Sequence, residues 1–158
     1  MKKLFVKAGA RYRPALKSEI AEAAAVYITG DMRGIKISAP RDTVAYLRSA
    51  FGGYDHEIFA VVFLNNRHYV IECEVMFRGT IDGASVHPRE ICKRALELNA
   101  AALILVHNHP SGDHTPSNAD LLITKKLVEA TTLLDMRIID HVIVSCTGSW
   151  SMAEKGQI

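Results

Sequence analysis

The chain has 158 residues, of which 49% are hydrophobic and 23% are charged, and its formal net charge at pH 7 is +2. This length and composition predict one globular domain with a substantial core, which excludes an intrinsically disordered or fibrous protein. The charge neither demands nor excludes a nucleic-acid partner, because lysine and arginine are spread along the chain with only a mild N-terminal excess.

The cysteines and the apolar stretches indicate a cytoplasmic protein. Cys73, Cys92 and Cys146 are odd in number and far apart, and no Cys-x-x-Cys pair is present, which argues against thiolate-bound zinc and against a disulfide framework. Lys7 interrupts the apolar stretch at the N-terminus, so we expect no signal peptide. No apolar run has the length of a membrane span, so we expect no membrane association.

The first half of the chain predicts an arm, two helices and a β-hairpin. Residues 1–13 are expected to form a tail or a short extended arm. Helical patterns over residues 16–28 and 38–51 each end near a glycine. The apolar run 57–64 predicts a buried strand, and an Asn-Asn turn leads back into a second strand over residues 68–77.

The second half alternates between helices and strands. After a loop at residues 79–83, the expected elements are a helix over 88–99, a strand over 101–106, a helix over 118–134 and strands over 137–145 and 150–152. This order predicts an α/β (α+β) fold in which helices sandwich a mixed sheet. The periodicity of the helix over 118–134 predicts a buried face that consists of Ala119, Ile123, Leu127, Ala130 and Leu134.

A metal-binding pattern begins where the strand over 101–106 ends. His107 and His109 have the same parity on an extended chain, so their side chains leave on one face and can share an ion. Asp120 lies in the first turn of the next helix and can add an oxygen ligand. Two imidazoles, a carboxylate and a water form a tetrahedral site with an open position, which is typical of catalytic zinc. Each half of the pattern also has an ordinary explanation: single histidines are usually surface or core residues, and Ser117-x-x-Asp120 alone is a helix capping box. The two halves together, in this order and spacing, favour a zinc site.

The order and spacing of these residues resemble the JAMM motif of the MPN-domain (JAB-like) metallopeptidases. The motif consists of His107, His109 and their following proline, then Ser117 and Asp120. The Asn-x-Pro-Ser-Gly variant that starts at Asn108 is similar to the RadC branch, as are the segments at residues 77–80, 86–90 and 140–144.

The resemblance to RadC extends from about Ile37 to the C-terminus. It implies an N-terminal arm and helix over residues 1–36 and an MPN (JAB-like) domain over residues 37–158, with a layered core like that of cytidine deaminases. Full-length RadC proteins carry an N-terminal helix-hairpin-helix region, which this chain is too short to hold. The chain therefore looks like the short form, a nearly bare catalytic domain.

The same resemblance implies a zinc-dependent peptidase or isopeptidase in which a metal-activated water is the nucleophile. In the JAMM family the catalytic glutamate stands just before the first core strand of the hairpin, a position that matches Glu57. The residues alone leave Glu72, Glu74 and Glu90 as other candidates for the general base. Alternation along a strand equally places Glu74 in solvent, and Glu90 is more simply a carboxylate at a helix start.

Other polar residues near the motif have predicted supporting roles. The hydroxyl of Ser117 can stabilise an oxyanion and can also cap the helix. Asn108 or nearby backbone carbonyls are candidates to orient the imidazoles. The pair Asp140-His141 interrupts an apolar strand, and we expect it to satisfy hydrogen bonds there, although a catalytic role stays open.

Two classes of function follow from the sequence. The first is a zinc metallohydrolase that acts on a peptide or protein substrate. The second is a non-catalytic RadC-like module in DNA repair or recombination, for which we expect weak DNA association because no aromatic platform or basic stripe supports it.

Two other interpretations are disfavoured. The complete ligand set argues against a degenerate scaffold that has lost its metal. A zinc nucleobase deaminase would need a His-x-Glu and a Pro-Cys-x-x-Cys signature, which this sequence lacks. Substrate identity and oligomeric state stay open.

Overall fold

Two strands that are buried along their whole length form the centre of the fold. The computed structural model describes residues 4–9, 11–39, 41–79 and 86–158. The five-stranded sheet consists, in spatial order, of β4 (Val70–Arg78), β3 (Ile58–Leu64), β5 (Ala102–Asn108), β6 (Arg137–Val144) and β7 (Ser149–Ser151). β5 and β6 are parallel and the other neighbours are antiparallel, so the sheet is mixed, as the sequence predicted.

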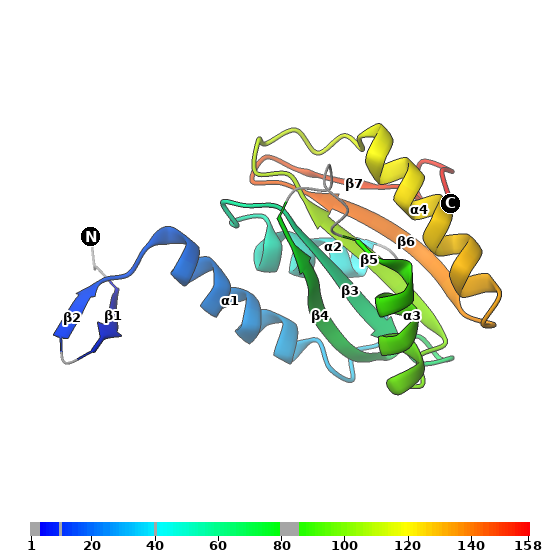
Figure 1. The fold of residues 1–158 in the computed structure, drawn as a ribbon, viewed down its shortest axis with the longest axis horizontal. Coiled ribbons are helices and arrows are strands. Elements are labelled where there is room, and N and C mark those ends of the chain that lie inside the picture. The colour runs from blue at the N-terminus through cyan, green and yellow to red at the C-terminus, as the bar shows by residue number, and fades with distance from the viewer. Residues whose placement is uncertain (1–3, 10, 40, 80–85) are drawn as a thin grey trace.

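Helices cover both faces of this sheet (Figure 1). One face packs against α1 (Lys17–Asp31) and α2 (Arg41–Phe51), and the other against α3 (Pro88–Glu97) and α4 (Asn118–Thr132). Because successive side chains of a strand point to opposite faces, β3 contributes alternate residues to two separate cores. The predicted sandwich is confirmed, with the ends of its elements shifted by a few residues. Of the loop expected at residues 79–83, only Gly79 is among the described residues.

The N-terminal segment forms a hairpin of two short strands, where the sequence predicted a tail or a short extended arm. β1 (Phe5–Ala8) pairs antiparallel with β2 (Arg11–Pro14), and the hairpin stands away from the sheet at the free end of α1 (Figure 1). Its attachment to α1 is polar. Glu19 accepts hydrogen bonds from the guanidinium of Arg13 at 2.6 and 2.9 Å and from the backbone N–H of Leu16 at 2.8 Å. Neither this strand pairing nor the ion pair between Arg13 and Glu19 was predicted from the sequence.

The buried face of α4 agrees only in part with the predicted one, since Leu127 is buried and Ile123 packs against the core but the other fully buried positions are polar. The buried residues of α4 are Asp120, Thr124, Leu127 and Thr131, whereas Leu134 lies beyond the helix and is 40% exposed. Of the five predicted positions, only Leu127 is fully buried. The threonines tolerate burial because each hydroxyl donates to the carbonyl four residues earlier, Thr124 to Asp120 and Thr131 to Leu127. An apolar periodicity cannot identify a face whose buried positions are mostly polar.

The crossover from β5 through α4 to β6 determines where the candidate site lies. A parallel pair needs such a crossover, which brings the N-terminus of α4 beside the carboxyl end of β5. Ligands of α/β proteins commonly bind outside the carboxyl ends of strands, and both parts of the His–His–Asp pattern meet at this edge. Among the described residues, no helix is long and apolar enough to cross a membrane.

Candidate metal centre

Two imidazoles meet at the carboxyl end of β5. His107 lies within the strand and is 1% exposed, and His109 follows just beyond the strand end. Their ring centroids are 4.9 Å apart and the ring planes are inclined by 82°. The Nδ1 atom of His107 lies 2.7 Å from the carbonyl oxygen of Ile58, and that of His109 lies 2.7 Å from the carbonyl oxygen of Asp113. A carbonyl only accepts, so each Nδ1 carries the proton and each neutral ring keeps its Nε2 lone pair for a ligand.

The carboxylate of Asp120 faces both Nε2 atoms. Its Oδ1 lies 3.8 Å from Nε2 of His107, and its Oδ2 lies 3.3 Å from Nε2 of His109. A reciprocal capping box at the start of α4 fixes this orientation. The hydroxyl and the backbone N–H of Ser117 both donate to Oδ2 at 2.7 Å, while the backbone N–H of Asp120 donates to the hydroxyl of Ser117 at 3.1 Å. The helix start therefore aims Asp120 at the imidazoles.

The three groups differ in how their surroundings affect ionisation. Burial lowers the pKa of His107, which favours the neutral imidazole that a metal requires. The carboxylate of Asp120 raises the pKa of His109 above its ordinary value. Burial opposes the charge on Asp120, but the nearby imidazole of His109 and the hydrogen bonds from Ser117 outweigh it and hold the pKa of this carboxyl well below its usual range. The centre thus combines a charged carboxylate with imidazole nitrogens, which is a suitable donor set for a divalent cation.

The geometry fits a metal ion. The ligand atoms of His107, His109 and Asp120 all lie within 4.8 Å of one another, so the group could hold one ion. Oδ1 of Asp120 is fully buried and has no hydrogen-bond partner among the residues that the structure describes. A buried oxygen of this kind is costly unless a cation or a donor meets it, and a metal would supply that partner. Two nitrogens and one oxygen match the ligands of catalytic zinc sites.

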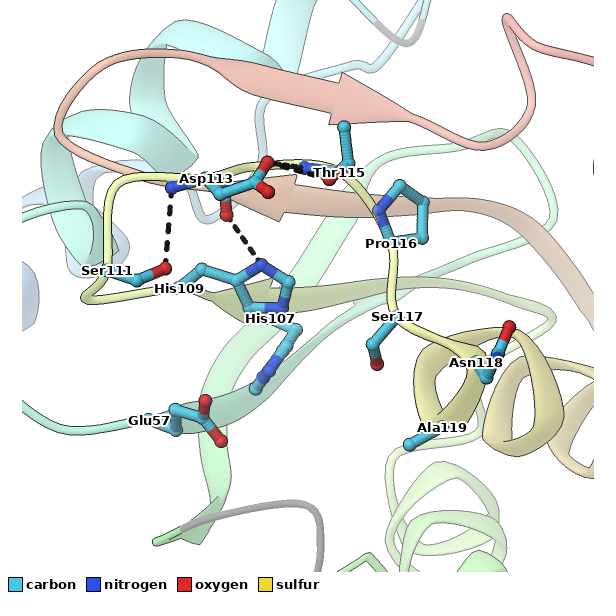
Figure 2. Close-up of a pocket in the computed structure, with 10 residues that line it drawn as sticks. All are labelled: Glu57, His107, His109, Ser111, Asp113, Thr115, Pro116, Ser117, Asn118 and Ala119. Carbon is cyan, nitrogen blue, oxygen red and sulfur yellow. Dashed lines mark hydrogen bonds between the residues drawn. The ribbon is translucent and has the colours of Figure 1, made fainter.

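Glu57 lies in the same cavity as these ligands. The cavity has a volume of about 740 Å³. Its lining includes Glu57, His107, His109 and Ser117. Figure 2 shows the carboxylate of Glu57 directed toward the ring of His107 from the segment just before β3. This carboxylate is not one of the three grouped ligands. It therefore occupies the place expected of a general base, and that role stays a prediction.

The other candidate carboxylates are paired with arginines elsewhere. Glu72 bonds to Arg33 across the edge of the sheet, with N–O distances of 2.5 and 3.0 Å. Glu74 forms an ion pair with Arg94 of α3, with an N–O distance of 2.5 Å. Glu90 forms one with Arg89 of the same helix, with an N–O distance of 3.2 Å. None of these three glutamates is among the residues lining the cavity. The position just before β3 thus separates Glu57 from the alternatives that the sequence left open.

The contacts of Asn108 differ from the suggested ones. Backbone carbonyls orient both imidazoles, and the alternation of β5 sends the side chain of Asn108 to the opposite face from His107 and His109. Its amide instead bonds to the backbone of His56 and Ile58. Of the two candidates for orienting the rings, only the carbonyls do so. Sequence reasoning missed this use of Asn108, although a polar residue inside a buried strand was a signal.

The Asp140-His141 pair makes structural hydrogen bonds. Asp140 accepts from the hydroxyl of Ser151 at 2.6 Å and from a backbone N–H in the turn after β7. His141 is fully buried behind the centre, where its Nδ1 lies 2.6 Å from the hydroxyl of Thr124. Burial lowers the pKa of His141, so this imidazole is neutral. These contacts hold α4 and the C-terminal turn against β6.

Comparison with known proteins gives the family of the chain. A model described as a RadC-like JAB domain matches residues 37–157. A UPF0758 protein of Vibrio cholerae is 51% identical over 135 residues, which cover 85% of each chain. A UPF0758 protein of Nitrosococcus oceani is 53% identical over 124 residues, which cover 78% of this chain and 55% of the relative. The chain thus spans most of one relative and about half the length of the other. It belongs to the family of proteins with a RadC-like JAB domain.

Proposed function

We propose that this protein is a zinc-dependent metallohydrolase of the JAMM type that cleaves a peptide or isopeptide bond. The observation that carries the proposal is the meeting of two kinds of group in one cavity. A compact donor set is formed by His107, His109 and Asp120. Glu57 lines the same cavity but is not one of these three ligands. Hydrolysis by an activated water requires both a metal site with an open position and a separate proton acceptor.

The residues divide the chemistry between them. A zinc ion bound by the three ligands would lower the pKa of a water and polarise the scissile carbonyl. Glu57 accepts a proton from the attacking water while the water oxygen forms a bond to the carbonyl carbon. Glu57 then delivers that proton to the leaving nitrogen as the C–N bond breaks. Ser117 keeps Asp120 in place through its hydrogen bonds. Its hydroxyl lines the cavity and would donate to an oxyanion only by turning its proton away from Oδ2 of Asp120.

The charges around the cavity favour a peptide over a polyanion. Glu57 and Asp113 are among its lining residues, and none of its described lining residues is lysine or arginine. A phosphodiester backbone would meet carboxylates at this surface without a cation from the protein to balance them. A neutral amide meets no such penalty. We therefore favour hydrolysis of peptide or isopeptide bonds over a nucleic-acid role for this cavity.

The test is a cleavage screen with purified protein of known metal content. The zinc-loaded chain would be incubated with libraries of internally quenched linear peptides and of isopeptide-linked peptides, and fluorescence would be followed. We expect cleavage that stops on removal of zinc by a chelator and returns when one equivalent is added. Cleavage that survives in fully metal-free protein would contradict the mechanism, and the absence of cleavage across both libraries would contradict the proposed activity.

A further inference from the structure

We propose that Asn108 is a positioning residue for Glu57, whose buried amide fixes the backbone on both sides of the carboxylate. This inference rests on the proposed function, because it assigns the purpose of holding Glu57 to a residue outside the donor set and outside the cavity lining. It explains why an amide stands between two histidines on a strand that is otherwise aliphatic. Asn108 is 1% exposed, so its polar atoms depend on partners within the protein.

The contacts of Asn108 bracket Glu57 in sequence. Its Oδ1 accepts the backbone N–H of Ile58 at 2.6 Å, and its Nδ2 donates to the carbonyl of His56 at 3.0 Å. The partners fix the orientation of the amide, because an N–H must face the oxygen and a carbonyl must face the nitrogen. One side chain thus holds the residue before Glu57 and the residue after it.

Glu57 needs such an anchor because it lies beyond the regular ladder. The pairing of β3 ends at Phe59 on the side of β5 and at Ile58 on the side of β4, so neither ladder includes Glu57. Two further bonds hold the same segment: Gly79 N–H donates to the carbonyl of Glu57 at 2.9 Å, and His107 Nδ1 donates to the carbonyl of Ile58. Adjacent residues of β5 therefore contribute a metal ligand and the clamp on the proposed base.

The anchor matters for catalysis because proton transfer depends strongly on distance. A general base acts from hydrogen-bond reach, and a displacement of about 1 Å costs on the order of 10²-fold in rate. Without the amide, the backbone at Glu57 gains freedom, while His109 and Asp120 keep their contacts with Asp113 and Ser117. Only the partner of His107, the carbonyl of Ile58, lies in the loosened segment. Loss of Asn108 should therefore impair proton transfer far more than zinc binding.

The experiment compares Asn108→Leu with a matched control, Asn65→Leu. Leucine has the branched shape and the number of side-chain heavy atoms of asparagine, although its volume is larger, and it makes no hydrogen bond. Asn65 is also an asparagine that holds backbone: its Oδ1 accepts from Arg67 and Tyr69 in the turn at the far end of β3. Zinc content, amide exchange at Ile58 by NMR, and kcat and KM for a quenched peptide found in the cleavage screen would be measured for both.

We expect Asn108→Leu to keep one zinc per chain and to speed exchange of the Ile58 amide at least about tenfold. We expect kcat to fall on the order of 10²-fold with little change in KM. In a Glu57→Gln background the same substitution should lower kcat no further, because its effect on kcat acts through Glu57. Asn65→Leu should leave all four quantities unchanged. Equal losses from Asn108→Leu in both backgrounds, or an unchanged kcat, would overturn the proposal.

Two additions keep the test decisive. If the leucine variant does not fold, Asn108→Asp keeps the acceptor for Ile58 and removes the donor to His56, and the same cycle with Glu57→Gln applies to it. If the zinc-loaded wild type cleaves no peptide, the proposed hydrolysis fails, and amide exchange alone judges the anchor. Unchanged exchange at Ile58 in the variant would then refute the role of Asn108, and an increase of at least about tenfold would support it.

Discussion

Oδ2 of Asp120 lies 3.3 Å from Nε2 of His109 and accepts two hydrogen bonds of 2.7 Å from Ser117. One oxygen therefore belongs both to the candidate metal centre and to the capping box of α4. The other oxygen, Oδ1, faces His107 at 3.8 Å. The consequence is that helix capping and metal binding depend on the same side chains, so a change in one should be measurable in the other.

Substitution of Ser117 should weaken both properties at once. Ser117→Ala removes a donor to Asp120 and the acceptor for its backbone N–H. We expect a loss of about 1 kcal/mol in the free energy of unfolding, as for other N-cap residues, measured by urea denaturation. We also expect about tenfold weaker zinc binding in competition with a chelating dye, because Asp120 loses its orienting partner. Ser117→Thr keeps the hydroxyl and should retain both; wild-type zinc affinity in the alanine variant would contradict this coupling.

Removal of both imidazoles should abolish metal binding and leave the fold. We expect about one zinc per chain in the wild type and none in His107→Ala/His109→Ala, measured by elemental analysis after gel filtration. The two cores lie on either side of the sheet and do not depend on an ion, so the far-ultraviolet circular dichroism should be unchanged. His87→Ala is a control at an exposed histidine outside the cavity lining. Stoichiometric zinc in the double variant would refute the assigned ligands.

Glu57→Gln should separate chemistry from metal binding. Glutamine keeps the size and a hydrogen bond of glutamate but cannot take up a proton at neutral pH. We expect hydrolysis of a peptide substrate to fall by roughly 10²–10⁴-fold with zinc content and thermal stability unchanged. Glu74→Gln and Glu90→Gln should be nearly silent, because those carboxylates pair with Arg94 and Arg89. A silent Glu57→Gln would mean that another group takes the proton.

DNA binding should be weak and sensitive to salt. With a net charge of +2, the chain releases few counterions on contact with a duplex. We expect dissociation constants in the range of about 10⁻⁴–10⁻⁶ M at physiological salt for a fluorescent duplex, with affinity falling as salt is raised. Sub-micromolar binding that persists after metal removal would instead favour the alternative of a module in DNA repair.

The N-terminal hairpin should be held to α1 through a strongly acidic Glu19. The hydrogen bond from Arg13 and the N–H of Leu16 lower the pKa of Glu19 to about 2. The charged form is stabilised in the fold, so this attachment is intact above pH 4.5 and is lost as pH falls toward 2. The carboxyl carbon of Glu19 should titrate well below pH 4.5 by NMR, and Arg13→Ala should raise its midpoint. Titration near the ordinary value in the wild type would show that the hairpin is not attached in this way.

The sequence predicted the central elements because their signals are local. The order of the predicted helices and strands indicated the mixed sheet, and the spacing of His107, His109 and Asp120 after an aliphatic strand indicated where the candidate centre lies. The face of α4 was predicted only in part, because Thr124 and Thr131 are buried through hydrogen bonds along their own helix. Contacts of this kind have no counterpart in apolar periodicity.

The remaining features depend on pairings that are distant in the sequence. The side chain of Asn108 bonds to a segment about 50 residues away, and spacing alone cannot indicate which backbone atoms it meets. The ion pair between Arg13 and Glu19, which attaches β2 to α1, likewise depends on how a strand and a helix meet in space. Only a three-dimensional structure provides such information for a single sequence.

The capping box of α4 also has a consequence for how an ion would enter the centre. Because Ser117 and the helix start already aim Asp120 at the two imidazoles, the site is preorganised before any cation arrives. Little chain entropy remains to be lost on binding. Metal uptake should therefore require little rearrangement of the ligands, and its rate should be governed by dehydration of the ion and by access through the cavity. The same rigidity would leave the centre equally ready to receive its ion again after each loss.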